Sequence, residues 1–104
     1  MAAARKAARV RTRRWDAANH LETPAARLAY LEAALAEGDP ALVAAALGDI
    51  ARSSGMSGVA REAGLGRESL YKSLSTGGNP ELATVLRVVG ALGLRLKPVL
   101  AKAG

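Results

Sequence analysis

Five polar residues around position 70 have side chains that suit contacts with DNA. Arg67 can donate two hydrogen bonds to guanine O6 and N7 or bind a phosphate, and Glu68 can accept from cytosine N4. Lys72 can reach a base or a phosphate, while Ser69 and Ser75 can donate to phosphate oxygens. An ordinary solvated helix face carries the same residue types, so the elements that position these side chains must decide between the two interpretations.

Two glycines, Gly64 and Gly66, interrupt the helical pattern of the segment 57–75. Each glycine would cost about 1 kcal/mol relative to alanine inside one continuous helix. The sequence therefore predicts two short helices, covering about 58–63 and 67–75, with a tight turn between them. Two helices joined by a short turn that contains glycine form a helix–turn–helix unit.

A helical wheel of the second helix separates an inner face from an outer face. At about 100° per residue, Leu70 and Leu74 point inward. Arg67 and Ser69 lie at the N-terminal end, where a recognition helix enters the major groove. Ser57 is expected to cap the first helix and to belong to the same DNA-binding surface. The residues left outward or flanking are Glu68, Tyr71, Lys72 and Ser75.

Three further segments, about 24–37, 40–54 and 80–92, have the pattern of amphipathic helices. Each begins with a capping residue followed by proline and ends at a glycine. The expected caps are Thr23, Asp39 and Asn79, and the expected inward residues are Leu28, Leu31 and Leu35, then Leu42, Val43, Ala46, Leu47 and Ile50, then Leu82, Val85, Leu86, Val89 and Leu92.

The C-terminal tail alternates apolar and basic residues from Leu94 to Lys97, which is typical of a short β-strand. Pro98 limits such a strand to a sheet edge or a ribbon. The scarcity of aromatic residues (3%) argues against a strand-rich domain. We therefore predict an all-α fold of five helices followed by a short C-terminal strand.

Length and composition limit the domain organisation and the chemistry that the chain can have. The 104 residues suffice for one domain, 15–104, preceded by a basic and flexible arm, 1–14. With no cysteine and one histidine, the sequence offers no disulfide, metal site or cofactor site. It shows no catalytic constellation, no membrane span and no signal peptide. The chain is therefore expected to be a cytoplasmic protein and not an enzyme.

Charge is distributed unevenly along the chain, although the net charge is +6. Residues 1–14 carry six bases and no acid, residues 15–50 carry six acids and one base, and residues 51–104 carry eight bases and three acids. The basic back half suits double-stranded DNA, and the acidic front half suits a basic protein partner.

The segment VAREAGLGRESLYKSLS, which starts at Val59, together with GNPELATVLRVVGALGLRL, resembles the Xre/lambda-repressor-like helix–turn–helix. The longer stretch from Tyr30 to Ser75 resembles the addiction-module antidote (antitoxin) family, also described as prophage-encoded DNA-binding proteins. The resemblance covers about 15–97, and the chain departs from it at Gly66, where the family commonly has a serine or threonine cap. It implies an antitoxin of a type II toxin–antitoxin pair, which would neutralise a basic RelE/ParE-type toxin and repress its own operon as a dimer.

Partner surfaces follow from these expectations. Trp15, Glu32 and Glu37 are candidate toxin contacts, since the toxin is expected to be basic. A homodimer would present two recognition helices to two half-sites, and either the alternating tail or the last helix could form its interface. Two alternatives remain: a stand-alone phage-type transcriptional repressor without a toxin, and a helical protein-interaction module that binds no nucleic acid.

Overall fold

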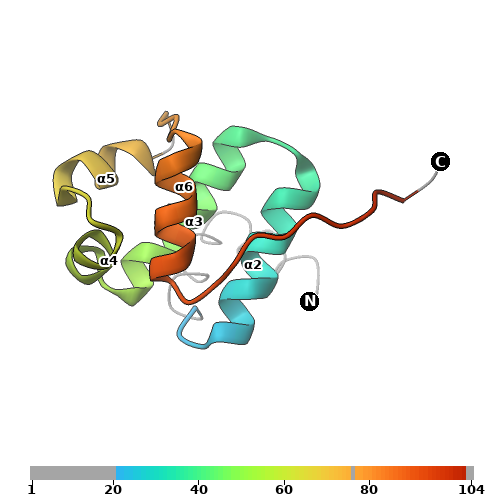
Figure 1. Cartoon of the computed structure of the whole chain (residues 1–104), viewed down its shortest axis with the longest axis horizontal. Coiled ribbons are helices and arrows are strands. Elements are labelled where there is room, and N and C mark those ends of the chain that lie inside the picture. Colours follow the sequence, from blue (N-terminus) through green and yellow to red (C-terminus); the bar gives the residue numbers. More distant parts are fainter. Residues whose placement is uncertain (1–20, 76, 103–104) are drawn as a thin grey trace, which may run out of the picture.

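The computed structural model describes residues 21–75 and 77–102, and these residues form five helices (Figure 1). The helices are α2 (Pro24–Glu37), α3 (Pro40–Ser54), α4 (Met56–Ala63), α5 (Arg67–Ser73) and α6 (Leu82–Ala91). The predicted all-helical fold is therefore confirmed. The basic arm and Trp15 lie outside the described residues. No helix in the described part of the chain is both long and apolar enough to span a membrane.

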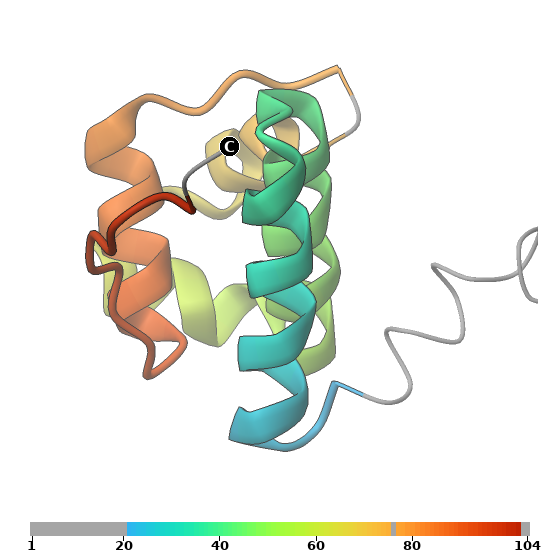
Figure 2. The same cartoon turned by 90° about the vertical axis from the view of Figure 1, so that its right-hand side faces the viewer.

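Helices α2 and α3 begin as the sequence predicts, and they pack side by side (Figure 2). The hydroxyl of Thr23 accepts a hydrogen bond from the amide of Ala26, and the carboxylate of Asp39 accepts one from the amide of Ala41. Proline occupies the first position of each helix, where its missing N–H is not needed. Gly38 ends α2 in a left-handed conformation, with φ of 71°.

Two predicted caps are wrong. Helix α4 begins at Met56 rather than after Ser57, because the earlier start brings the side chain of Met56 into the core. Helix α6 begins at Leu82, with Glu81 rather than Asn79 at its N-cap. The preceding loop is held close to the end of α5, since a Cβ on Gly78 would collide with the carbonyl of Ser73. Pro80 consequently lies in the loop and not in the helix.

The core lies where α3, α4 and α6 meet the buried side of α5. The predicted inward positions are right for α3 at Ala46, Leu47 and Ile50, and for α6 at Val89 and Leu92. Five predicted inward leucines are instead exposed, because each lies beside the stripe that its helix buries. They are Leu28 and Leu35 on α2, Leu42 on α3, and Leu82 and Leu86 on α6.

The C-terminal tail, residues 94–102, leaves α6 after Gly93 and passes in front of α2 (Figure 1). The amide of Leu94 donates to the carbonyl of Val89 at 3.0 Å, and the side chains of Leu94 and Leu96 pack against the core. Within the described residues no segment is paired as a β-strand, so the predicted C-terminal strand is not formed in the single chain.

Candidate nucleic-acid interface

The turn between α4 and α5 is built around Gly64, whose φ of 72° and ψ of 33° are left-handed. The amide of Gly64 bonds to the carbonyl of Arg61 at 3.2 Å, and that of Leu65 bonds to Ala60 at 2.9 Å. A residue with a Cβ would be strained in this conformation. The two glycines therefore mark a break between two helices, as the sequence predicts.

Helix α5 is short and is anchored from one side. It has seven residues and starts at Arg67, with Gly66 as an N-cap that supplies no side-chain hydrogen bond. The side chains of Leu70 and Leu74 are almost completely buried in the core. Because a seven-residue helix is not stable alone, these two leucines hold it in place and leave its other face to solvent.

The exposed face of α5 gathers most of the residues predicted to contact DNA. These residues are Arg67, Glu68, Ser69, Tyr71 and Lys72, all of which are exposed. Ser57 is exposed in the first turn of α4. Ser75 lies beyond the end of α5, and its hydroxyl donates to the carbonyl of Lys72 at 2.7 Å. The hydroxyl hydrogen of Ser75 is thus engaged within the protein and is not directed at a phosphate.

Arg52 on α3 belongs to this region but was not among the predicted residues. Its guanidinium donates to the carboxylate of Asp49 at 2.7 Å and lies 6.0 Å from the ring centroid of Tyr71. The second oxygen of Asp49 accepts from the hydroxyl of Tyr30 at 2.6 Å. The spacing of Asp49 and Arg52 on one helix could have indicated their ion pair, but their links to α2 and α5 depend on the tertiary fold.

Asp49 is a buried carboxylate, 3% exposed, that joins α2 to α3, and through Arg52 it supports the contact with Tyr71 of α5. Replacing Asp49 with alanine removes an acceptor from both Tyr30 and Arg52, and we expect a loss of about 1–3 kcal/mol in the free energy of unfolding. Urea denaturation of the variant measures this loss. The matched control is Asp39→Asn, which keeps a capping side chain at an exposed position and should change stability by less than about 0.5 kcal/mol. Equal stability of the Asp49 variant and the original would contradict a structural role for this carboxylate.

Two close backbone contacts fix the C-terminal end of α5. A Cβ on Gly48 of α3 would lie too close to the carbonyl oxygen of Leu74, and one on Gly78 would meet the carbonyls of Ser73 and Lys72. Glycine at these positions lets the end of α5 approach α3 and the following loop. The packing of α3 and the following loop against α5 therefore sets the orientation of its exposed face.

The predicted toxin contacts lie elsewhere. Glu32 and Glu37 are exposed on α2, and α2 lies on the side of the molecule away from α5 (Figures 1 and 2). Trp15 is outside the described residues. In the part of the chain that the structure describes, no group of acidic or histidine residues could hold a metal ion.

The fold and the exposed face define a small helical protein in which a two-helix unit with a glycine turn presents a polar helix. The chain belongs to the family described as probable addiction module antidote protein, whose model matches residues 11–100. It is 47% identical over 83 residues to an uncharacterized protein of Haemophilus influenzae, and the match covers 80% of this chain and 86% of that relative. No solved structure matches the chain. Membership of an antidote family implies a toxin partner.

Proposed function

We propose that this antidote protein binds DNA and, as a dimer, represses the operon that encodes it and its toxin. Helices α4 and α5 form an Xre/lambda-repressor-like helix–turn–helix in this proposal, with α5 as the recognition helix. The observation that carries it is the seven-residue α5, which is anchored behind by two buried leucines and exposes Arg67 and Lys72 in front.

The side chains on α5 divide into those that read bases and those that bind the DNA backbone. Arg67 and Ser69 lie in the first turn of the helix, the part that reaches base edges when a recognition helix enters the major groove. Lys72 lies more than one turn further on and suits a phosphate. Tyr71, which lies beside the guanidinium of Arg52, adds a ring that can pack on the sugar–phosphate backbone.

The toxin that we propose is a small basic protein of the RelE/ParE type, and it binds to α2. Glu37, an exposed acid at the C-terminal end of α2, offers the complementary charge. Because α2 lies away from α5, the toxin and the operator can be bound by separate surfaces of one chain (Figure 1). The charges at the two surfaces also have the signs that their proposed partners require.

Co-expression with the product of the adjacent gene tests the complete proposal. We expect the two proteins to purify together and to shift a fragment that contains the promoter of their operon. Loss of the partner with retention of the shift would identify a stand-alone repressor. Co-purification without any shift would identify a protein-interaction module and would contradict the DNA-binding part of the proposal.

Salt dependence provides a quantitative test of phosphate contacts. If Lys72 neutralises one phosphate in each of two protomers, it should contribute about −1.8 to the slope of log K against log salt, at about −0.9 for each phosphate. Fluorescence anisotropy of a labelled operator between low and moderate salt measures the slope. In the Lys72→Ala variant the slope should become less steep by about 1.8. A slope near zero would exclude phosphate contacts as the source of affinity.

A further inference from the structure

A groove of about 240 Å³ lies between α2 and the C-terminal tail. Its α2 side includes the exposed leucines Leu28 and Leu35, and its tail side includes Val99. The tail residues that follow Leu96 are hardly covered, since Val99 is 78% exposed and Leu100 is 97% exposed. Apolar side chains on both walls of one groove indicate a surface that is completed by another molecule.

The backbone of the tail also has N–H and C=O groups that could pair with a strand of another chain. Leu94 makes the last backbone hydrogen bond along the tail, and among the described residues none joins 95–102 to the rest of the chain. The tail follows an extended path past α2 (Figure 1). An extended segment with unpaired N–H and C=O groups is a template for a strand from another chain.

The charges at the groove have both signs on one surface. Glu32 on α2 faces the same groove as Arg95 and Lys97 on the tail. In a two-fold symmetric interface the same patch meets itself, so an acidic side and a basic side on one patch can each find the opposite charge in the partner. A basic toxin would match only the acidic side and would be repelled by the two bases. The charge pattern therefore favours a second copy of this chain.

We propose that two copies associate through residues 94–100, with the tails paired as an antiparallel ribbon and each Val99 packed on α2 of the other copy. This inference deepens the proposed function, because it assigns the surface of the dimer that the function requires. It assigns Glu32 to the dimer and leaves Glu37 for the toxin. Helix α5 lies on the side away from this groove and stays exposed in both copies (Figures 1 and 2).

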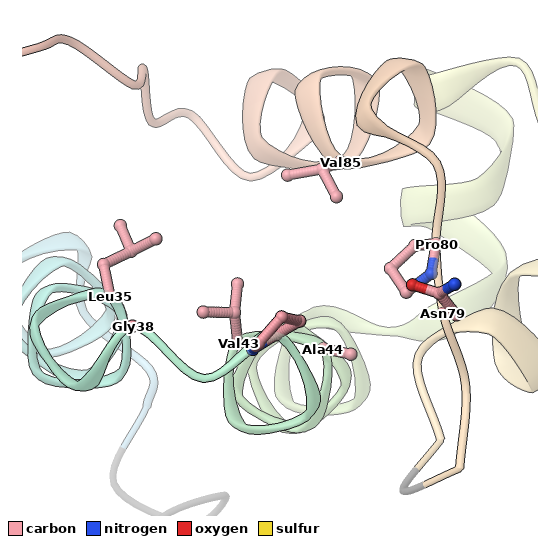
Figure 3. Close-up of a pocket in the computed structure, with 8 residues that line it drawn as sticks. Leu35, Gly38, Val43, Ala44, Asn79, Pro80 and Val85 are labelled. Atoms are coloured by element: carbon pink, nitrogen blue, oxygen red, sulfur yellow. The ribbon is translucent and has the colours of Figure 1, made fainter.

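The competing surface is α6, where Leu82 and Leu86 are exposed. The apolar face continues toward α6 through a second hollow of about 280 Å³, in which Leu35, Val43 and Val85 face one another (Figure 3). The lining residues Leu35, Val43 and Val85 of this hollow belong to helices whose backbone groups are already paired, and Asn79 and Pro80 come from the loop before α6. The tail offers unpaired backbone groups as well as apolar side chains, and for this reason we assign the interface to the tail.

Light scattering during gel filtration of the full chain at about 50 μM tests the assignment with two matched double variants. The original chain should be a dimer. The variant Val99→Asp/Leu100→Asp should be a monomer, with a dimer dissociation constant raised at least tenfold, while Leu82→Asp/Leu86→Asp should stay dimeric. All four side chains are exposed, so thermal melting should show that both variants fold. A monomeric original chain, a dimeric tail variant, or dissociation caused by the α6 variant would overturn the proposal.

Hydrogen exchange and the operator shift separate this inference from the proposed function. Alternate amides among residues 95–97 should exchange more slowly in the original chain than in the tail variant, because every second residue of an antiparallel ribbon is bonded to the partner strand. A tail-paired dimer that does not shift the operator would refute DNA binding and uphold the interface. A tail variant that stays dimeric but no longer co-purifies with the adjacent gene product would show that the groove holds the toxin, and would overturn the interface.

Discussion

Replacing Arg67 and Lys72 together with alanine is expected to weaken operator binding by the dimer about 10,000-fold and to leave thermal stability nearly unchanged. Each side chain is exposed on α5, so its loss should not disturb the core. A single good contact to a base or phosphate contributes about 1–3 kcal/mol. A dimer loses four such contacts, two in each protomer, and at about 1.4 kcal/mol each, a factor of ten apiece, they give the expected effect. Anisotropy titrations at one fixed salt concentration measure it.

A control must remove the same charge from another surface. Arg87 on α6 and Lys102 in the tail are exposed and lie outside the α4–α5 unit. The variant Arg87→Ala/Lys102→Ala should weaken binding by no more than about threefold, through the general loss of positive charge. If both double variants lose affinity equally, binding depends on net charge and α5 is not a recognition helix. If the Arg67/Lys72 variant binds normally, the recognition-helix assignment is wrong.

Substituting alanine for Gly48 is expected to lower the free energy of unfolding by about 1–3 kcal/mol, in the range for an overpacked core. The added methyl group would collide with the backbone carbonyl of Leu74, which cannot rotate away as a flexible side chain could. To relieve the contact, the C-terminal end of α5 must move away from α3. Urea denaturation measures the loss, and nuclear magnetic resonance shifts of α5 amides should report the displacement.

The matched control is a second helical glycine, Gly58 on α4. A Cβ at Gly58 would meet nothing within 4 Å, so alanine there should raise stability by about 0.4–1 kcal/mol. Opposite signs for the two glycine-to-alanine changes would show that Gly48 is required for close packing and not for backbone freedom. Stabilisation by both would contradict the close approach of α3 and α5.

The positions of the helices were largely predictable because their ends carry local signals. Thr23 and Asp39 cap their helices through hydrogen bonds to amides two or three residues away, and Gly64 needs only its own left-handed conformation. Asn79 failed as a cap because the path of its loop is set by the contact of Gly78 with the end of α5. A tertiary contact of this kind leaves no local pattern in the sequence.

Burial was harder to predict than helix position, since alanine and leucine occur on several sides of each helix. On α6 the stripe that includes Leu82 and Leu86 and the stripe that includes Val88 both satisfy helical spacing. Only the neighbouring helices decide which stripe is buried, and they bury Val88. Two of the exposed leucines, Leu28 and Leu35, line the groove beside the tail, and Leu35 also lines the second hollow.

The exposed residues of the candidate site could be predicted from the sequence, but the contacts that hold α5 in place could not. Arg67 and Lys72 follow from the helical wheel once the turn is recognised, and both are exposed as expected. The contact between Arg52 and Tyr71 joins residues 19 positions apart, and Gly48 meets Leu74 across a similar separation. Pairings of this range depend on how α3 crosses α5, which a single sequence does not specify.

The anchoring of α5 by Leu70 and Leu74 has a consequence for how its sequence preference can change. With seven residues and no capping side chain at its N-terminus, α5 is not stable on its own, so its position depends on its two buried leucines. A substitution in α3 that shifts these anchors would tilt all the outward side chains together. In the DNA-binding role that we propose for α5, mutations buried behind the helix would therefore change operator preference without altering any residue on its exposed face.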